Sequence, residues 1–564
     1  MIRMRFRMPS SFGFALLVLL AAPGFGAPPV PPRARNIIVL IADGCGSEQY
    51  TLARWWQGQP LCLDGILVGA VKTHIADSVV ADSAPAATAY ATGCRTGDKL
   101  IGISPGGKTL ACVPAPAPEQ TFAPLATVME GARLLGKATG IVVTCRIPHA
   151  TPAGYLAHVP HRDAYNDIMK QIVHQRLDVV FGGGKRYLLP KGIEDGERTD
   201  GENLLEFLRT TGGYQVVETR EKLAELQSGR AFGVFASKDL EAEIDRAEFG
   251  PQQPSLAEMT GKAIELLAQD PDGFFLLVEA SQVDWAGHAN DPAHLLGDLC
   301  MYDASVRVAL EFAQRNGETL LLALSDHNTG GMSIGNYATS DDSRYAQMSA
   351  AELLDPLRRM SCSAVALWRL LGEERTPDKV KDLVRSRWGM EASAAAVARI
   401  LQLAPTLKSH PEYAIGQVLS PEHTCIGWTT RGHVGGDVPL FAFGPGRPSG
   451  LIDAPAVGVH CAQAMGLDLA RLTARLFVDA EAAFGAGAVT VEPEAASGPV
   501  ARIAVGGRVG ELLLHTNLLK LDGATIPLEG LSVYIPSRRR LYVPQQAVEL
   551  LQRNPGVALP SFRE

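Results

Sequence analysis

The chain alternates short apolar runs with longer amphipathic segments over most of its 564 residues. This alternation constrains the fold more than any other feature of the sequence. Strands that alternate with helices predict an α/β fold, here a three-layer sandwich with a largely parallel central sheet. The runs that we interpret as buried strands are Asn36–Ala42, Gly140–Thr144, Asp178–Phe181, Phe274–Glu279, Thr319–Ser325 and Val438–Phe443. Helical segments such as Leu256–Gln269 and Pro292–Gln314 separate most of them.

Acidic residues stand where several of these predicted strands end. Asp43, Glu279 and Asp326 each lie at or directly after the carboxyl end of an apolar run. In open parallel sheets, binding sites form beyond the carboxyl ends of the strands. Asp43 also enters a glycine turn, which suits a metal ligand, although such turns are mostly structural. The sequence therefore predicts that these carboxylates lie at one edge of the sheet.

A serine follows in a segment of small residues, Val80-Ala-Asp82-Ser83-Ala-Pro-Ala-Ala-Thr-Ala. The small residues allow a helix to begin at Ser83 and to direct its backbone N–H groups at an anion. Ser83 is then a candidate nucleophile. The alternative is that Asp82 or Ser83 serves only as a helix N-cap.

Histidines and further polar residues occur in four other segments. Asp284 and His288 are four residues apart, so one helical turn places both on one face, a suitable pair for zinc. His327 follows Asp326, and His433 lies in a glycine-rich loop. The remaining segment, residues 149–162, contributes His149, Thr151 and Arg162. Each segment alone has a structural explanation, and only their combination indicates a catalytic site.

In this order and spacing, the segments resemble the alkaline phosphatase family from about Asn36 to Ala480. The most specific motifs are the Asp-Ser-Ala-x-x-Ala-Thr-Ala run that begins at Asp82 and the Glu-x4-Asp-x3-His run that begins at Glu279. The resemblance implies a hydrolase that cleaves small-molecule phosphomonoesters at alkaline pH. The reaction would proceed through a phosphoseryl intermediate and would release inorganic phosphate.

The same resemblance implies a role for each motif residue. Arg162 would bind the phosphoryl oxygens, and Ser83 would be the nucleophile beside the second of two zinc ions. The implied cofactors are two Zn²⁺ and one Mg²⁺. The implied ligands are Asp284, His288 and His433 for the first zinc, Asp43, Asp326, His327 and Ser83 for the second, and Asp43, Thr151 and Glu279 for magnesium.

Two residues depart from the best-studied bacterial members of that family. Those members have an aspartate where this chain has His149 and a lysine where it has Trp285. We expect both side chains to lie in the substrate pocket, near magnesium and phosphate. Since tryptophan offers only one N–H donor, we expect weaker retention of product phosphate than in a lysine-bearing relative.

The first 27 residues predict an export signal. Arg3, Arg5 and Arg7 precede the apolar run Phe14–Ala22, and small residues up to Ala27 offer a cleavage site. We therefore expect a periplasmic or extracellular protein without a membrane span after leader removal. An uncleaved anchor is the alternative, although the run is short for a span.

The predicted domain organisation places most of the chain in one catalytic unit. Around residues 483–498 the composition turns rich in Ala, Gly, Glu and Pro, which is typical of a linker. The predicted parts are a signal peptide (1–27), a catalytic domain (28–485) with a helical insertion at about 340–425, a linker (486–499) and a small β-rich accessory domain (500–564).

Charge and cysteine content limit the partners. The formal net charge of −8 argues against nucleic acid as the main partner. The nine cysteines include no C-x-x-C pair, so we do not expect a thiolate zinc site, and their pairing does not follow from the sequence. Members of the resembled family are commonly homodimers, so a homodimer is kept as an option.

Two other functions are compatible with parts of the pattern. Related metalloenzymes cleave phosphodiesters or sulfates, but they often replace the serine and lack the third metal site. A phosphate-binding protein on a degenerate fold should have lost at least one ligand. All the implied ligands are present here, which favours a phosphomonoesterase.

Overall fold

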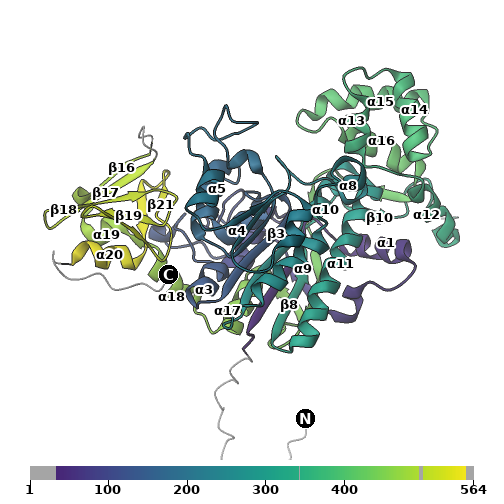
Figure 1. The fold of residues 1–564 in the computed structure, drawn as a ribbon. Coiled ribbons are helices and arrows are strands. Elements are labelled where there is room, and N and C mark those ends of the chain that lie inside the picture. Colours follow the sequence, from purple (N-terminus) through teal and green to yellow (C-terminus); the bar gives the residue numbers. More distant parts are fainter. Residues whose placement is uncertain (1–32, 342, 344, 494–498, 554–564) are drawn as a thin grey trace, which may run out of the picture.

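The computed structural model describes residues 33–341, 343, 345–493 and 499–553. The expected signal peptide 1–27 and part of the expected linker 486–499 lie outside these residues. Figure 1 shows a central α/β body, a group of helices at one end and a β-rich region at the other. Within the described ranges, no helix has the length and hydropathy needed to cross a membrane.

A ten-stranded sheet forms the centre of the body and confirms the predicted fold class. Only β13 runs against the rest, antiparallel to both β8 and β2. The strands, in their order across the sheet, are β14 (Gly450–Asp453), β2 (Leu67–Lys72), β13 (Asp437–Phe443), β8 (Thr319–Leu324), β1 (Asn36–Ala42), β7 (Phe274–Ala280), β3 (Ala138–Arg146), β4 (Val179–Gly183), β6 (Ala231–Val234) and β5 (Gln215–Val217).

Apolar layers cover both faces of this sheet because the side chains of each strand alternate between them. In β1, Ile38 and Leu40 belong to one core, while Ile37, Val39 and Ile41 belong to the other. All five are fully buried, and burial of each contributes about 1.5–3 kcal/mol. The first core packs against α1 (Ser47–Gln57), α9 (Leu256–Leu267) and α11 (Pro292–Asn316), and the second against α2 (Ser83–Thr92), α4 (Ala150–Leu156) and α17 (Ala454–Met465).

The register of the central strands brings their carboxyl ends level. Ile41 of β1 pairs with Glu279 of β7 on one side and with Leu324 of β8 on the other. The Tyr302 hydroxyl of α11 donates a hydrogen bond to the Leu40 carbonyl at 3.0 Å and so ties the helix to β1. Residues that follow these strands therefore meet at one edge of the sheet.

Five helices form the group at one end of the body (Figure 1). They are α12 (Ala350–Arg358), α13 (Ala364–Leu371), α14 (Pro377–Trp388), α15 (Ala394–Leu403) and α16 (Tyr413–His423). Trp388 is fully buried among them and donates its indole N–H to the Cys362 carbonyl at 2.9 Å. This group occupies most of the predicted insertion at 340–425.

The C-terminal region is β-rich, as predicted, but its strands begin before residue 500. Its five-stranded antiparallel sheet consists of β16 (Val489–Glu492), β17 (Val500–Val505), β18 (Arg508–Leu513), β19 (Leu518–Leu521) and β20 (Ala524–Pro527). A three-stranded sheet of β15 (Val478–Asp479), β22 (Arg540–Val543) and β21 (Val533–Ile535) lies beside it, with α20 (Gln545–Gln552). Strand β16 falls inside the predicted linker 486–499.

The C-terminal region contacts the body next to α5 (Tyr165–Gln175). Phe477 packs edge-on against the buried His158 ring, with 4.6 Å between ring centroids. Gln171 of α5 accepts a hydrogen bond from the His158 backbone N–H at 2.8 Å and lies 3.1 Å from His515 Nδ1. These contacts hold the segment that leads to Arg162.

Candidate functional site

Ser83 is the first residue of α2 and lies at the edge where the central strands end. Helix α2 consists of small residues that pack closely on α4, where a Cβ on Gly154 would lie 2.8 Å from the Ala87 Cβ. The Ser83 side chain is almost fully buried. Its Oγ lies 3.1 Å from His327 Nε2 and 3.5 Å from Asp43 Oδ1.

Asp82 holds an arginine beside this serine rather than capping the helix. The Asp82 side chain makes no capping hydrogen bond and instead accepts one from the Arg162 guanidinium. The other terminal nitrogen of Arg162 lies 3.3 Å from His149 Nε2. Although burial opposes ionisation of Asp82, Arg162 lowers its pKa. The pair thus fixes a cation next to Ser83.

One group of potential metal ligands consists of Asp284, His288 and His433. His288 Nε2 lies 3.3 Å from Asp284 Oδ2, and His433 Nε2 lies 3.5 Å from Asp284 Oδ1. The Nδ1 atoms of the two histidines lie 2.5 Å from the Arg431 carbonyl and 2.8 Å from the Ala81 carbonyl, respectively. Nδ1–H donation to a carbonyl leaves Nε2 free for a metal ion.

A second group consists of Asp43, Asp326 and His327, all fully buried. His327 Nε2 lies 3.4 Å from Asp43 Oδ1 and 3.3 Å from Asp326 Oδ2. Asp326 Oδ1 accepts a hydrogen bond from the Gly44 N–H at 3.1 Å. Among the described residues, the second oxygen of each aspartate, Oδ2, has no hydrogen-bond partner. An ion at this position would satisfy both oxygens.

A third group contains Cys145, His149 and Glu279. Cys145 Sγ is 3.4 Å from Glu279 Oε2. Within the described part of the chain, Glu279 Oε1, His149 Nδ1 and the hydroxyl of the neighbouring Thr151 are buried without a hydrogen-bond partner. Cys145 was not among the residues that the sequence singled out, because nothing in its surroundings marks it as a ligand.

The electrostatics of the site favour bound cations. Burial, together with Asp326 and Asp284, raises the pKa of Asp43 well above its usual range. Burial also raises the pKa of Glu279 to about 7 and, with Asp284 nearby, that of Asp326 to about 6. Buried carboxylates this close together ionise jointly only when positive charge is present. The donor set and its unpartnered oxygens therefore fit divalent cations.

Thr329 contacts both of the first two groups of potential metal ligands, and it was not among the residues predicted from the sequence. It lies in β9 (Asn328–Thr329), which pairs with β12 (His433–Val434) so that Thr329 stands opposite His433. Its Oγ1 donates a hydrogen bond to Asp284 Oδ1 at 2.5 Å and lies 3.3 Å from His327 Nδ1. No local sequence signal distinguishes this threonine from others.

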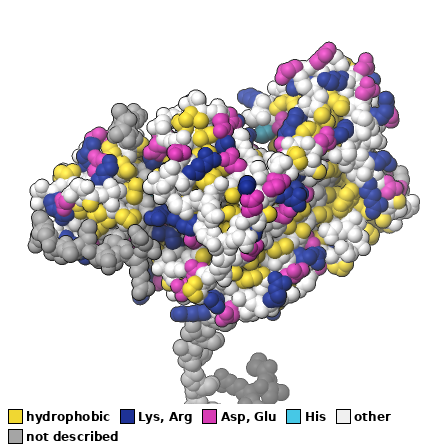
Figure 2. Space-filling model, viewed as in Figure 1, with side chains coloured by type: hydrophobic (Ala, Val, Ile, Leu, Met, Phe, Trp, Pro, Cys, Tyr) yellow, Lys and Arg dark blue, Asp and Glu magenta, His cyan; other side chains and the backbone are white. Residues whose placement is uncertain are grey.

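A cavity of about 820 Å³ opens above Ser83. Its floor includes Arg162 and Trp285, whose ring meets that of His149 edge-on at 5.7 Å between centroids. One wall is formed by residues 236–242, and the other by the helical insertion, including Arg369. On the face shown in Figure 2, acidic and basic side chains are interspersed without a wide area of one charge.

An ion pair joins the two walls of this cavity. Arg369 Nη2 of the insertion lies 3.0 Å from Glu241 Oε2 of the opposite wall. Tyr413, the first residue of α16, also lines the cavity and stacks on His410 with 4.7 Å between ring centroids. The insertion therefore contributes side chains that line the cavity above Ser83.

The structure brings every predicted site residue into one region around Ser83. None lies elsewhere in the described residues. These residues are Asp43, Ser83, His149, Thr151, Arg162, Glu279, Asp284, Trp285, His288, Asp326, His327 and His433.

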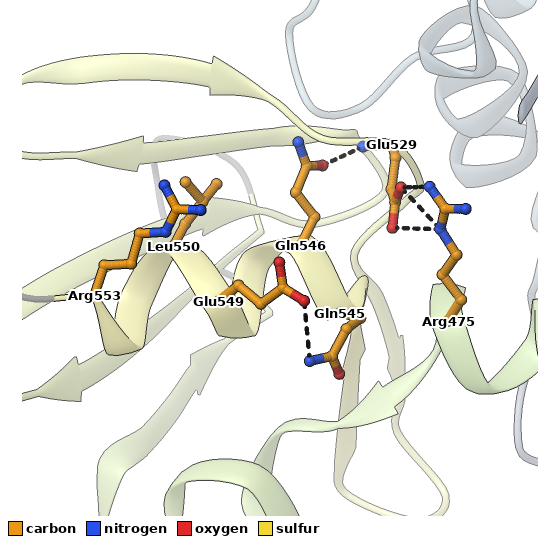
Figure 3. Close-up of a pocket in the computed structure, with 7 residues that line it drawn as sticks. All are labelled: Arg475, Glu529, Gln545, Gln546, Glu549, Leu550 and Arg553. Atoms are coloured by element: carbon orange, nitrogen blue, oxygen red, sulfur yellow. Dashed lines mark hydrogen bonds and ion pairs between the residues drawn. The ribbon is translucent and has the colours of Figure 1, made fainter. Parts of the chain in front are cut away.

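A separate pocket of about 370 Å³ lies where α18 (Leu469–Leu476) meets the C-terminal region (Figure 3). Two pairs of its lining side chains interact. Arg475 forms an ion pair with Glu529, and Glu549 accepts a hydrogen bond from Gln545 at 3.5 Å. Among the described residues, none of the groups of potential metal ligands includes a residue of this pocket, and Ser83 does not line it.

Comparisons with known proteins find relatives over most of the chain. Residues 34–466 match the family model described as alkaline phosphatase. Alkaline phosphatase 3 of Bacillus subtilis (strain 168) is 32% identical over an alignment of 462 residues that covers 76% of this chain and 89% of that protein. The repressible alkaline phosphatase of Saccharomyces cerevisiae is 32% identical over 364 residues, covering 58% of this chain and 61% of that protein.

Solved structures of alkaline phosphatases resemble this fold. The crystal structure of Thermus thermophilus alkaline phosphatase has a TM-score of 0.68 at 28% identity and covers 78% of this chain and 93% of that chain. A cold-active alkaline phosphatase from a psychrophilic Shewanella species has a TM-score of 0.62 at 27% identity, covering 76% and 99% of the two chains. The family match ends at residue 466, before the C-terminal β-rich region begins.

Proposed function

Because the chain belongs to the alkaline phosphatase family, we propose that it hydrolyses phosphate monoesters at alkaline pH through a phosphoseryl intermediate. The proposed centre holds two zinc ions, one at Asp284, His288 and His433 and one at Asp43, Asp326 and His327. A third divalent cation, magnesium by resemblance, would lie at Thr151 and Glu279 and share Asp43. One observation carries the proposal: Ser83 Oγ lies within 3.5 Å of both Asp43 and His327.

Ser83 is the proposed nucleophile. Its position at the first residue of α2 places its Oγ beside backbone N–H groups that favour a bound anion. When bound, the cations neutralise the carboxylates, lower the pKa of the serine hydroxyl and polarise the phosphoryl group. Ser83 Oγ then attacks phosphorus and the ester oxygen leaves as the alcohol. Water later cleaves the phosphoserine and releases inorganic phosphate.

Arg162 is the proposed phosphate ligand. Its planar guanidinium offers two parallel N–H donors that match two phosphoryl oxygens. The Asp82 carboxylate accepts a hydrogen bond from that fork and so holds it beside Ser83 before substrate arrives. Preorganised donors of this kind lower the barrier because they need no rearrangement during the reaction.

The test is hydrolysis of p-nitrophenyl phosphate as a function of pH. We expect the wild type to be active at alkaline pH, and we expect Ser83→Ala and removal of zinc by a chelator each to abolish most of the rate. Ser305→Ala is the matched control, because that buried serine donates its hydroxyl to the Met301 carbonyl of its own helix, α11, at 2.8 Å. A metal-replete wild type that is inactive would refute the proposal, and phosphodiesters and sulfates would be tried next.

We also propose that the protein is exported, since residues 1–27 have the composition of a signal peptide. Cell fractionation of the full chain tests this proposal. Accumulation of the unprocessed chain in the cytoplasm would contradict it.

A further inference from the structure

The third group of potential ligands differs in chemistry from the site that the family resemblance implies. Magnesium prefers oxygen ligands in near-ideal octahedral geometry and usually keeps several water molecules. Thr151 and Glu279 supply oxygens, but a thiol and an imidazole stand beside them in Cys145 and His149. Sulfur and imidazole ligands suit zinc and other transition metals instead.

The geometry permits all these atoms to reach one ion. The candidate atoms of Cys145, His149 and Glu279 lie within 4.8 Å of one another. Tetrahedral ligands at about 2.0–2.3 Å from zinc stand roughly 3.5 Å apart. The Cys145 sulfur already lies 3.4 Å from Glu279 Oε2. Small side-chain movements are therefore enough to close the site around an ion.

The backbone holds Cys145 in this place. It lies near the end of β3, where Val143 pairs with Glu279 of β7, and its N–H donates to the Ser281 hydroxyl at 3.2 Å. Cys145 is fully buried, and its thiol lies against the Glu279 carboxylate rather than in solvent. Among the described residues, His149 Nδ1 and Glu279 Oε1 are buried without a hydrogen-bond partner, and an ion bound between them would satisfy both.

We propose that Cys145 and His149 join Glu279 and Thr151 as ligands of the third cation, and that this site selects zinc over magnesium. The Cys145 thiol gives its proton to solvent as sulfur binds the ion, and its contact with Glu279 is replaced by two bonds to the same ion. The thiolate and the carboxylate then supply two negative charges to one divalent cation. The proposal rests on cation binding at this centre, but not on the chemistry proposed for Ser83.

The first experiment uses cobalt as a spectroscopic substitute for zinc. A cobalt-loaded wild type should show a thiolate-to-cobalt charge-transfer band in the near ultraviolet, and Cys145→Ser should lose it. Cys461→Ser is the matched control, because Cys461 is equally buried but lies in α17. The band should persist in Ser83→Ala, so its measurement does not need an active enzyme. A band that survives in Cys145→Ser, or that is absent from the wild type, overturns the proposal.

The second experiment measures metal content and needs no variant that must fold. After dialysis against zinc with excess magnesium, the wild type should retain three zinc ions per chain. Zinc-edge X-ray absorption should then show a sulfur neighbour at about 2.3 Å. Two zinc ions with one magnesium and no sulfur neighbour would overturn this proposal while leaving the proposed function intact. A wild type that binds no cation would overturn both.

Discussion

Replacing Thr329 by valine removes one hydroxyl from between two groups of proposed zinc ligands and keeps the shape of the side chain. Thr329 is fully buried, and a Cβ added at Gly44 would lie 2.7 Å from its Oγ1. A Cβ added at Gly287 would lie 3.0 Å from the Thr329 Cβ. The side chain therefore fits tightly between two glycines, and only a residue of equal shape tests the hydroxyl alone.

The hydroxyl has one proton, which it gives to Asp284 at 2.5 Å. It must then accept a hydrogen bond from His327 Nδ1, 3.3 Å away, and this fixes the tautomer in which His327 Nε2 is free to bind an ion. Valine removes both bonds. Loss of a hydrogen bond to a charged group costs about 1.5–3 kcal/mol, and the histidine N–H would be left buried without an acceptor.

We expect zinc affinity to fall about 10–100-fold in Thr329→Val, as for other residues that orient metal ligands. This range corresponds to about 1.4–2.8 kcal/mol, within the cost of the lost bonds. The assay is competition with a zinc chelator, read as metal content. Thr329→Ser keeps the hydroxyl and should retain the affinity. Thr260→Val removes an equally buried hydroxyl in α9 and should not change it. An affinity of Thr329→Val within twofold of the wild type would refute the reasoning.

Three other substitutions test separate parts of the structure. Trp285→Lys adds a positive charge beside the proposed phosphate site, so the phosphate inhibition constant should fall about tenfold or more, and tighter inhibition of the wild type would contradict this. Burial opposes ionisation of Glu130, but His158 lowers its pKa below the usual value. The ionised Glu130 therefore stabilises the fold above about pH 4.3, the ordinary pKa of glutamate, and this stabilisation is lost as the pH falls further. The unfolding free energies of the wild type and Glu130→Gln should therefore differ by a constant amount at neutral pH and converge in acid, and a pH-independent difference would refute the assignment. Gly44→Ala should lower the unfolding free energy by about 2 kcal/mol or more in denaturant titrations, because φ is +73° and the added Cβ would meet the Asp284 backbone at 2.8 Å; unchanged stability would contradict this.

Much of the sheet and of the candidate site could be predicted because both depend on local patterns. The apolar runs that precede Asp43 and Asp326 directly indicate buried strands and the positions where those strands end. The spacing between Asp284 and His288 reports one face of a helix, and the structure places both in α10 (Gln282–Ala289). Ser83 likewise begins a helix, as its small neighbours indicate.

The remaining features depend on tertiary neighbours, which a pattern in one segment does not report. Strand β2 is missing from the prediction because its residues are mostly half-exposed at the side of the sheet. The reversed direction of β13 is set by its pairing with β8 and β2, not by its own residues. Thr329 and Cys145 acquire their surroundings only when distant segments meet. The ion pair between Arg369 and Glu241 across the cavity has the same origin.

The position of β1 between β7 and β8 also bears on how the protein folds. Residue 37 pairs with residue 275 on one side and with residue 320 on the other, so the strand that leads into Asp43 finds its neighbours only late in synthesis. Pairings between such distant segments slow folding, because the loop between them must close first. Until then the apolar strand is exposed to aggregation. Chains released before about residue 325 would lack the second neighbour of β1, and metal ions would find only part of their ligands. We therefore expect metal ions to bind late and to stabilise a sheet that has already assembled, rather than to nucleate the formation of the sheet.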